Sequence, residues 1–535
     1  MRKVSALHRV RSKLRNRDSL FHPKSNRYKW FVLANIMLGT FMAVLDATIV
    51  NVGLPKIMSS FGVGLDTIQW IITAYMLAMA AMLPTSGWLA DKFGYKQVYF
   101  WGLFLFTAGS LLCGLSNDET TLIISRIIQG LGAGTVQPLG MAIITREFPP
   151  KQRGVALGFW SIAAAASVSF GPLLGGYLVD NFSWQLIFYI NVPVGILALF
   201  FTVIIQREFI HPNVRKFDFV GFLSVVIFLP VLLYALSEGN SAGNSAGWGA
   251  PHILICFAVS AIALAVFLTR ELTTKSPLLE LRLLADRNFG LANLFMLVFG
   301  LGMFGSTFLL PLYLQNTLGY TALQSGAVFL PVGIIQGLIA PMVGIVSDKT
   351  NPKIPLTFGI GLLGISFILN YYLSYNSEHS FIMLSLYLRG LGMGMIFTPL
   401  STMSLMSIPR DHMAQASSIS NTVRQIGGSL GVAILSTMLT ARTSFHAQVY
   451  GQAIQANSQE VQNVTHNMAY YIQQHGGSSY STALKQGQSL LMQHVNVQAF
   501  IQGVDDDFFL AAMVTFIGFV PIIFLHTKKK AALKH

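Results

Sequence analysis

The hexapeptide GWLADK occupies residues 87–92, directly after the second long apolar segment of the chain, and GIVSDK occupies residues 344–349, 257 residues further on, after a corresponding segment. Two other pairs recur at nearly the same offset: Gly-Leu-Gly at 130–132 and 390–392, and a proline before basic residues at 149–153 and 409–410. A register kept across three landmarks indicates two related halves. This organisation is typical of a transporter that rocks one helical bundle against the other.

The composition is that of a membrane protein. Of the 535 residues, 53% are hydrophobic and 10% are charged, and this charged fraction is about half that of a soluble protein. A helix crosses the hydrocarbon core with about 20 apolar residues. We therefore expect an all-α polytopic membrane protein with fourteen spans, near 30–53, 68–90, 98–116, 120–145, 155–178, 184–205, 217–237, 251–269, 289–312, 323–346, 355–375, 380–407, 412–440 and 507–526.

Twelve of these spans form two halves of six, and the other two lie between the halves. A Gly-, Ser- and Asn-rich loop at 238–247 joins the two extra spans and is expected to be flexible. We expect this pair to be an insertion that flanks the core and faces lipid. The expected parts are a basic tail (1–29), a six-helix bundle (30–205), the insertion with its linkers (206–288), a second six-helix bundle (289–526) and a second basic tail (527–535).

The positive-inside rule orients the chain. With the N-terminus in the cytoplasm, only Lys56, Arg442 and Lys485 fall on the outer side, so we expect a multi-pass protein of the inner membrane with both termini cytoplasmic. The formal net charge of +14 is spread over the tail and many short loops. This spread favours topology signals and contact with anionic lipid over nucleic-acid binding.

The two cysteines fall inside spans, so we expect no disulfide, metal site or cofactor.

The longest polar stretch, residues 441–506, lies on the outer side between the last two spans. Apolar residues recur in it at roughly helical spacing, in two sets: Val449, Ala453, Val461, Val464, Met468 and Ile472, then Leu490, Leu491, Val495 and Ile501. The pattern predicts an external helical hairpin. This hairpin would either pack on itself as a cap or bind a periplasmic protein.

Four ionisable side chains lie well inside the spans: Asp46, Arg126, Arg389 and Arg424. A charge in hydrocarbon costs about 3 kcal/mol on insertion scales, so these residues are functional candidates. Asp46 is the only carboxylate in a span interior, and its depth agrees with that of Arg126. Burial favours the neutral acid while a nearby arginine favours the carboxylate, so a movement that separates the pair would let Asp46 take up a proton. The alternative is a fixed ion pair that sets helix register.

The other two arginines have no acidic partner in their half. Arg389 and Arg424 are expected to contact helix carbonyls, Gln425 or an anionic group of a substrate. In the fifth span, GPLLGG at 171–176 begins with Gly171 and Pro172. Because proline removes a backbone donor and glycine permits close helix contact, this segment predicts a hinge or a packing seam.

The duplicated loops predict a conformational latch, made by Gly87, Asp91 and Lys92 in one copy and by Gly344, Asp348 and Lys349 in the other. The glycines would permit tight helix contact at the cytoplasmic edge. The aspartates would pair with loop bases or cap a helix N-terminus on the facing bundle. Making and breaking these contacts would bias the inward-closed state.

These motifs together resemble the major facilitator superfamily, and within it the fourteen-span drug:proton antiporters of the EmrB/QacA type. Residues 87–97 are similar to the superfamily's loop signature after span two. Five stretches of the chain resemble motifs of these antiporters: LDATIVNVGLP at 45–55, RIIQG at 126–130, Gly171-Pro172, Trp184 with IFYINVPVG at 187–195, and NTVRQIGG at 421–428. The resemblance runs from about residue 30 to 526. A departure is Gly53, where this family usually has alanine.

This resemblance implies export of amphipathic drugs, dyes, detergents or fatty acids, driven by inward proton flow. Asp46 would carry the proton and Arg126 would tune it. Side chains expected along the substrate route are Trp70, Tyr75, Gln129, Gln137, Met141, Arg389 and Arg424. Transporters of the EmrB type work with a periplasmic adaptor and an outer-membrane channel, and the enlarged last outer loop resembles theirs.

Two other functions stay open. Because a fold does not fix direction, the chain would also suit proton-linked uptake or the movement of lipid or fatty acid. A different class is a membrane scaffold or receptor that binds a protein through the hairpin. The sequence contains no Gly-x-x-x-x-Gly-Lys-Ser/Thr loop, which disfavours an ATP-driven pump. No nucleophile–base arrangement stands out, so an enzyme is not expected.

Overall fold

The computed structural model describes residues 27–63, 65–210, 218–239, 246–274, 277–406, 408–409, 412–453, 458–476 and 479–525. Within these ranges the ordered elements are helices, and no β-strand occurs. The two basic tails predicted at 1–29 and 527–535 lie outside the described residues, except for 27–29.

The first half contains six long or paired helices. They are α2 (Tyr28–Phe61), α3 (Leu65–Phe93), α4 (Tyr95–Leu115), α5 (Glu119–Glu147), α6 (Arg153–Asn181), and the pair α7 (Leu186–Tyr189) and α8 (Asn191–Ile205). α2 packs against α5, α6 and α8, and α5 packs against α3 and α4. This arrangement encloses the middle of α2, where Asp46 lies, between helices from the same half.

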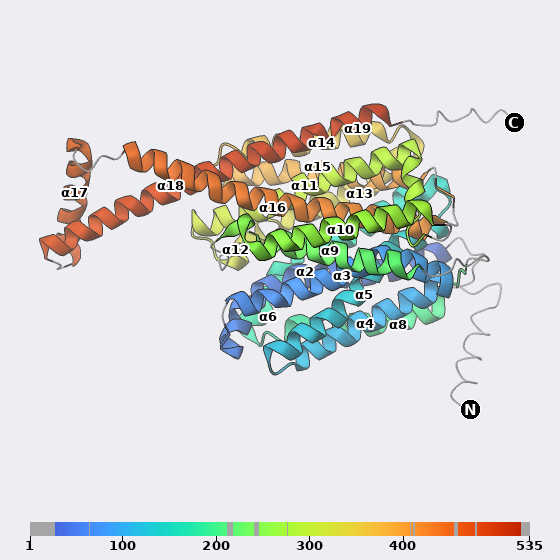
Figure 1. Ribbon diagram of the computed structural model, residues 1–535. Helices are drawn as coiled ribbons and strands as arrows, with labels where there is room; N and C mark the ends of the chain where they lie inside the picture. Colours follow the sequence, from blue (N-terminus) through green and yellow to red (C-terminus); the bar gives the residue numbers. More distant parts are fainter. Residues whose placement is uncertain are drawn as a thin grey trace.

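The second half follows two inserted helices, α9 (Phe219–Glu238) and α10 (Pro251–Thr273). Its helices are α11 (Arg287–Asn316), α12 (Ala322–Ala327), α13 (Leu330–Lys349), α14 (Lys353–Asn370), α15 (His379–Met406), α16 (Met413–Ala453), α17 (Gln459–Gly476), α18 (Tyr480–Ile517) and α19 (Phe519–Phe524). Two long contacts join the halves, between α6 and α13 and between α3 and α16. In Figure 1 the two bundles lie one above the other with their helices roughly parallel.

Thirteen helices among the described residues are long and apolar enough to cross a membrane. This confirms the all-α polytopic fold. The remaining expected span, 412–440, lies in α16, whose first part is rich in serine, glycine, asparagine and glutamine. α16 nevertheless packs against α3 and α5 of the first half and against α11 and α18 of the second. Protein neighbours therefore cover much of the polar surface of this helix.

The inserted helices lie against both halves. α9 packs on α3 and α16, while α10 packs mainly on α9. The ring of Trp70 on α3 stacks on that of Tyr234 on α9 with centroids 5.7 Å apart. Trp248, just before α10, donates a hydrogen bond from Nε1 to Thr437 Oγ1 on α16 at 2.8 Å. The insertion thus covers the α3–α16 side of the junction between the halves.

The described residues of the external stretch, 441–453, 458–476 and 479–506, are almost entirely helical, as their spacing predicts. α16 and α18 continue beyond the bundle, and α17 packs against the first part of α18 (Figure 1). We call α17 and residues 480–500 of α18 the hairpin, the end of the bundle that carries it the hairpin end, and the opposite end, with residues 87–97, the loop end. Three members of the predicted apolar set, Val449, Val464 and Leu490, are 42%, 42% and 48% exposed. Thr465 and Ala469 on α17 are buried instead. The spacing of apolar residues predicts a helix, but it does not show which face of that helix meets α18.

Candidate functional site

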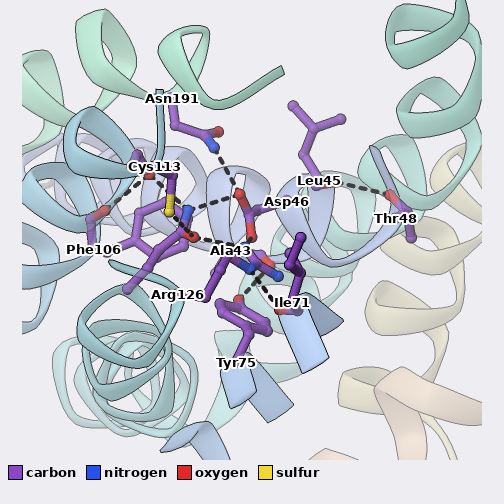
Figure 2. A network of polar contacts seen from close by, with 12 residues as sticks. Ala43, Leu45, Asp46, Thr48, Ile71, Tyr75, Phe106, Cys113, Arg126 and Asn191 are labelled. Atoms are coloured by element: carbon purple, nitrogen blue, oxygen red, sulfur yellow. Dashed lines mark hydrogen bonds and ion pairs between the residues drawn. The ribbon is translucent and has the colours of Figure 1, made fainter. Parts of the chain in front are cut away.

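Asp46 and Arg126 meet in the interior of the first half (Figure 2). Asp46 lies on α2 with no exposed surface, and Arg126 lies on α5 with 1% exposed. Arg126 donates from Nη1 to Asp46 Oδ2. The structure therefore brings together the two residues whose equal depths predicted contact.

The carboxylate of Asp46 has two further donors. Gln129 Nε2 donates to Asp46 Oδ1 at 2.7 Å, and Asn191 Nδ2 donates to the same oxygen at 3.1 Å. Gln129 also donates to Ser110 Oγ at 2.7 Å and accepts from Arg126 Nη1 at 2.6 Å. The side chains of Arg126, Gln129 and Asn191 therefore all donate hydrogen bonds to the Asp46 carboxyl group in this conformation.

Arg126 is fixed independently of Asp46. Its Nε donates to the carbonyl oxygen of Ile71 on α3 at 3.1 Å. Its guanidinium carbon lies 4.0 Å from the centre of the Tyr75 ring, and the Tyr75 hydroxyl donates to the carbonyl of Ala43 at 3.2 Å. A guanidinium over an aromatic face is stabilised by the ring quadrupole. Arg126 thus has several contacts besides Asp46.

Small residues allow the helices to approach closely at this site. A Cβ at Gly109 on α4 would lie 2.6 Å from the backbone nitrogen of Gln129, so only glycine lets α5 lie where Gln129 reaches Asp46. A Cβ at Gly171 on α6 would collide with Thr48 Oγ1 on α2. The Gly171 segment is therefore a packing seam against the helix that carries Asp46. α6 is continuous through position 172, and the side chain of Pro172 lies outside the described residues.

At the loop end, the first copy of the repeated loop contacts the second half. Asp91 Oδ2 accepts from Gln415 Nε2 in the first turn of α16 at 2.9 Å. The backbone N–H of Ala414 donates to Tyr95 Oη at 3.3 Å, and a Cβ at Gly87 would lie 3.1 Å from the Cα of Gln415. An aspartate at a helix N-terminus is stabilised by the helix dipole, as the sequence predicts for Asp91.

Further hydrogen bonds close the same seam. Ser417 Oγ donates to the carbonyl of Pro138 at 2.7 Å, and Ser418 Oγ donates to that of Leu83 at 2.6 Å. The hydroxyls of Ser86 and Ser418 lie 2.8 Å apart. These contacts join α3 and α5 to α16. They hold the two halves together at the loop end in this conformation.

The second copy of the loop packs differently. A Cβ at Gly344 on α13 would collide with the carbonyl oxygen of Gly154 on α6, so this glycine permits tight contact between the halves. Lys349 lies in the last turn of α13, and the side chain of Asp348 lies outside the described residues. Lys92 Nζ lies over the rings of Trp88 and Phe93, 4.7 and 5.1 Å from their centres, on its own helix.

The expected route residues occupy different environments. Tyr75 and Gln129 belong to the Asp46 network, whereas Trp70 is 42% exposed and lies against the insertion. Gln137 is half-buried on α5. Met141 is buried, and its sulfur lies 4.0 Å from Asn421 Nδ2 on α16.

The two intramembrane arginines of the second half, Arg389 and Arg424, are held by neutral groups. Arg389 donates from Nη2 to Thr307 Oγ1 at 2.5 Å, and its guanidinium carbon lies 5.5 Å from the centre of the Phe367 ring. Arg424 donates from Nη2 to Asn421 Oδ1 at 2.7 Å and lies 5.5 Å from the centre of the Phe397 ring. Hydrogen bonds and aromatic faces stabilise a buried cation only in part.

Sequence reasoning missed three participants: Asn191, Ser110 and Gln415. Asn191 lies within the 187–195 motif, which was a signal for a role, although not for contact with Asp46. Ser110 is one of a few polar residues on the largely apolar helix α4, and Gln415 is one of many polar residues in the first part of α16, so neither carried a signal of its own.

A duplicated bundle of membrane helices with a buried carboxylate–guanidinium pair defines a secondary membrane transporter. Residues 36–432 match the Major Facilitator Superfamily, and the chain belongs to this family.

Several relatives share this family. The uncharacterized MFS-type transporter YhcA of Bacillus subtilis is 33% identical over 94% of each chain. The multidrug export protein EmrB of Haemophilus influenzae is 33% identical over 91% of this chain and 94% of its own. The multidrug resistance protein Stp of Mycobacterium tuberculosis is 33% identical over 78% and 77%.

A solved structure supports the fold. The human organic anion transporter MFSD10 aligns with a TM-score of 0.59 at 12% identity, covering 93% of this chain and 99% of that one. At this identity the likeness shows the shared fold alone.

Proposed function

We propose that the chain exports amphipathic toxic compounds in exchange for protons, without a cofactor. The observation that carries the proposal is the fully buried carboxyl group of Asp46, which accepts hydrogen bonds from Arg126, Gln129 and Asn191. Relatives named for multidrug export or resistance support the substrate class. The loop end would face the cytoplasm and the hairpin end the outside of an inner membrane, in keeping with the positive-inside rule.

Proton uptake by Asp46 would drive the conformational change. A neutral acid no longer compensates Arg126, which keeps Gln129, Ile71 and Tyr75 as partners. The tie between α2 and α5 is thereby weakened, because charge-assisted hydrogen bonds are about twice as strong as neutral ones. α2 would then shift relative to α5, and the seam at the loop end would open. Release of the proton to the cytoplasm would restore the ion pair.

A pH-gradient assay tests this function. Everted membrane vesicles that contain the protein are acidified inside, and an amphipathic dye such as ethidium or a naphthalenesulfonate is added. Antiport predicts that the dye dissipates the pH gradient in proportion to the amount of protein. A scaffold or receptor would give no response, and proton-linked uptake into cells would move dye and protons in the same direction.

The loop-end latch gives a second test. Asp91→Asn removes the negative charge next to the first turn of α16, an interaction worth about 0.3–1 kcal/mol. We expect a several-fold increase in opening at the loop end. A cysteine introduced at the buried Ser417 should then react faster with an impermeant maleimide applied from the cytoplasmic side, while substrate affinity changes little.

Asp286→Asn is the matched control for the latch. Asp286 also lies at the loop end, where it accepts from the N–H of Phe289 at 2.9 Å at the start of α11, and asparagine serves equally well as an N-cap. Equal maleimide rates in Asp91→Asn and wild type would rule out the latch.

We further propose that the hairpin binds a periplasmic adaptor protein. Its tip presents Tyr470 and Tyr471, which are 60% and 65% exposed, and exposed aromatic side chains are enriched in protein interfaces. The hairpin base is tied down separately: Asp506 Oδ2 on α18 lies 3.1 Å from Arg442 Nε and 2.9 Å from His446 Nε2 on α16. The tip can therefore be removed while the base is kept.

Removal of residues 451–494 should separate transport from adaptor binding. A linker of four to six Gly and Ser residues spans about 10–15 Å, enough to join adjacent helices. We expect antiport in vesicles to persist and drug resistance of whole cells to be lost. Loss of antiport in the shortened protein would instead make the hairpin part of the transport machinery.

A point variant checks the same idea without shortening the chain. Tyr470→Ser with Tyr471→Ser should reduce whole-cell resistance alone. Tyr372→Ser, a 66% exposed tyrosine next to α14, is the control and should have no effect.

A further inference from the structure

The intramembrane arginines of the two halves are compensated differently. In the first half, Asp46 compensates Arg126. In the second half, Arg389 and Arg424 lie deep in the bundle, and within the described ranges neither has a carboxylate partner. One nitrogen of Arg389, Nη1, is buried and has no hydrogen-bond acceptor among the described residues. An intramembrane charge without a partner in the protein points to a partner that comes and goes.

Arg424 is the arginine that touches the interface. Its hydrogen-bond acceptor, Asn421, contacts Met141 of the first half at 4.0 Å. The ring of Phe397, next to the Arg424 guanidinium, lies against the ring of Trp160 on α6 with centroids 5.7 Å apart. The two side chains that contact the Arg424 guanidinium, Asn421 and Phe397, thus each contact a side chain of the first half, Met141 and Trp160 respectively.

Arg424 also keeps accessible surface. It is half-buried, as is Phe397, whereas Arg389 is 2% exposed. In transporters of this architecture, substrates bind near the bilayer midplane at the interface between the halves. Arg424 therefore has the position and the exposure that direct contact with a substrate needs.

We propose that Arg424 binds the acidic group of an amphipathic organic anion, such as a carboxylate or sulfonate attached to a flat apolar body. A guanidinium matches the geometry of such a group with two parallel hydrogen bonds. The apolar body would lie against Phe397, Trp160 and Met141. This inference deepens the proposed export function and rests on it.

The charge of the substrate changes the energetics of exchange. Export of one monoanion for one imported proton moves two positive charges inward, so an interior-negative membrane potential drives it. Export of a monocation for one proton moves no net charge. An interior-negative membrane potential imposed with potassium and valinomycin should therefore accelerate the exchange of an anionic substrate for protons.

Two dyes with the same apolar skeleton test the site. 1-Anilinonaphthalene-8-sulfonate is a permanent anion, and N-phenyl-1-naphthylamine is the same skeleton without the sulfonate. Binding of each to the full chain in nanodiscs, above that of empty nanodiscs, is measured by equilibrium dialysis. In Arg424→Gln we expect the affinity for the sulfonate to fall at least tenfold and that for the amine to stay within twofold.

Other variants keep the test decisive. Arg424→Lys should retain most of the affinity for the sulfonate, and Arg442→Gln, which removes an arginine from the same helix at the hairpin end, should change neither dye. If Arg424→Gln does not fold, the comparison of sulfonate and amine in the wild type decides: equal specific binding overturns the proposal. Equal sulfonate affinity in folded Arg424→Gln and wild type also overturns it.

The outcomes distinguish this inference from the export function. Loss of sulfonate binding in Arg424→Gln supports the anion site even if no dye is transported, and absence of transport would then count against export alone. Transport of ethidium that depends on Asp46, with no Arg424-dependent sulfonate binding, would support export and refute the anion site.

Discussion

Asp46→Asn is expected to reduce proton-driven efflux to the level of vesicles without the protein, while the protein still folds. Asparagine has the same shape and can accept a hydrogen bond from Arg126, but it cannot take up a proton at physiological pH. Arg126 would keep Gln129, Ile71 and Tyr75 as partners, so the variant should reach the membrane. Substrate exchange without a proton gradient should persist, since it needs binding and rocking but no net proton transfer.

Asp118→Asn is the matched control for this loss. Asp118 is the N-cap of α5, the helix that also carries Arg126, and its Oδ1 accepts from the N–H of Thr121 at 2.8 Å. The Thr121 side-chain and backbone hydrogen bonds lower the pKa of Asp118, which is exposed. Asparagine caps helices as well as aspartate does, so efflux should be unchanged. Efflux at the wild-type rate in Asp46→Asn would remove Asp46 from the proton pathway.

The fold was predictable because apolar length and repetition are local properties of the sequence. The duplicated loops indicated two related halves, and the apolar runs placed most helix ends to within a few residues. Hydropathy did not locate every helix end, however: the run expected to stop at 440 continues as α16 to Ala453, and the run expected to begin at 507 lies in α18, which begins at Tyr480. A helix leaving the membrane changes its composition without changing its backbone.

The site was predictable only in part because its contacts join distant helices. Equal depth predicted the contact of Asp46 with Arg126, since both positions are measured along parallel axes. Asn191, which donates to Asp46 from 145 residues away, depends on how α8 rotates against α2. The contact of Asp91 with Gln415, 324 residues apart, depends on how the halves meet. Neither the rotation of α8 against α2 nor the way in which the halves meet produces a periodic pattern in the sequence.

The largest loss of stability is expected from Arg126→Gln. Breaking a buried ion pair by removing one partner costs about 3–5 kcal/mol, because the remaining charge is left uncompensated. Asp46 would keep Gln129 and Asn191 as donors but lose its only cation among the described residues. Denaturant unfolding in a fixed membrane mimetic should show the loss directly. Arg442→Gln, which breaks a partly exposed pair, should cost less than about 1 kcal/mol.

The pH dependence of that loss identifies its cause. In Arg126→Gln the folded protein can neutralise the buried charge only by keeping a proton on Asp46. The unfolded chain instead gives up that proton at the pH at which an exposed aspartate ordinarily ionises. Folding of the variant is then linked to proton uptake, so its stability falls as pH rises. The double variant Asp46→Asn/Arg126→Gln has no buried charge at this site, and it should recover most of the stability and lose the extra pH dependence, yet remain inactive in efflux. If the double variant is as unstable as Arg126→Gln alone, Arg126 stabilises the fold through Ile71 and Tyr75 rather than through Asp46, and the ion pair is not the switch.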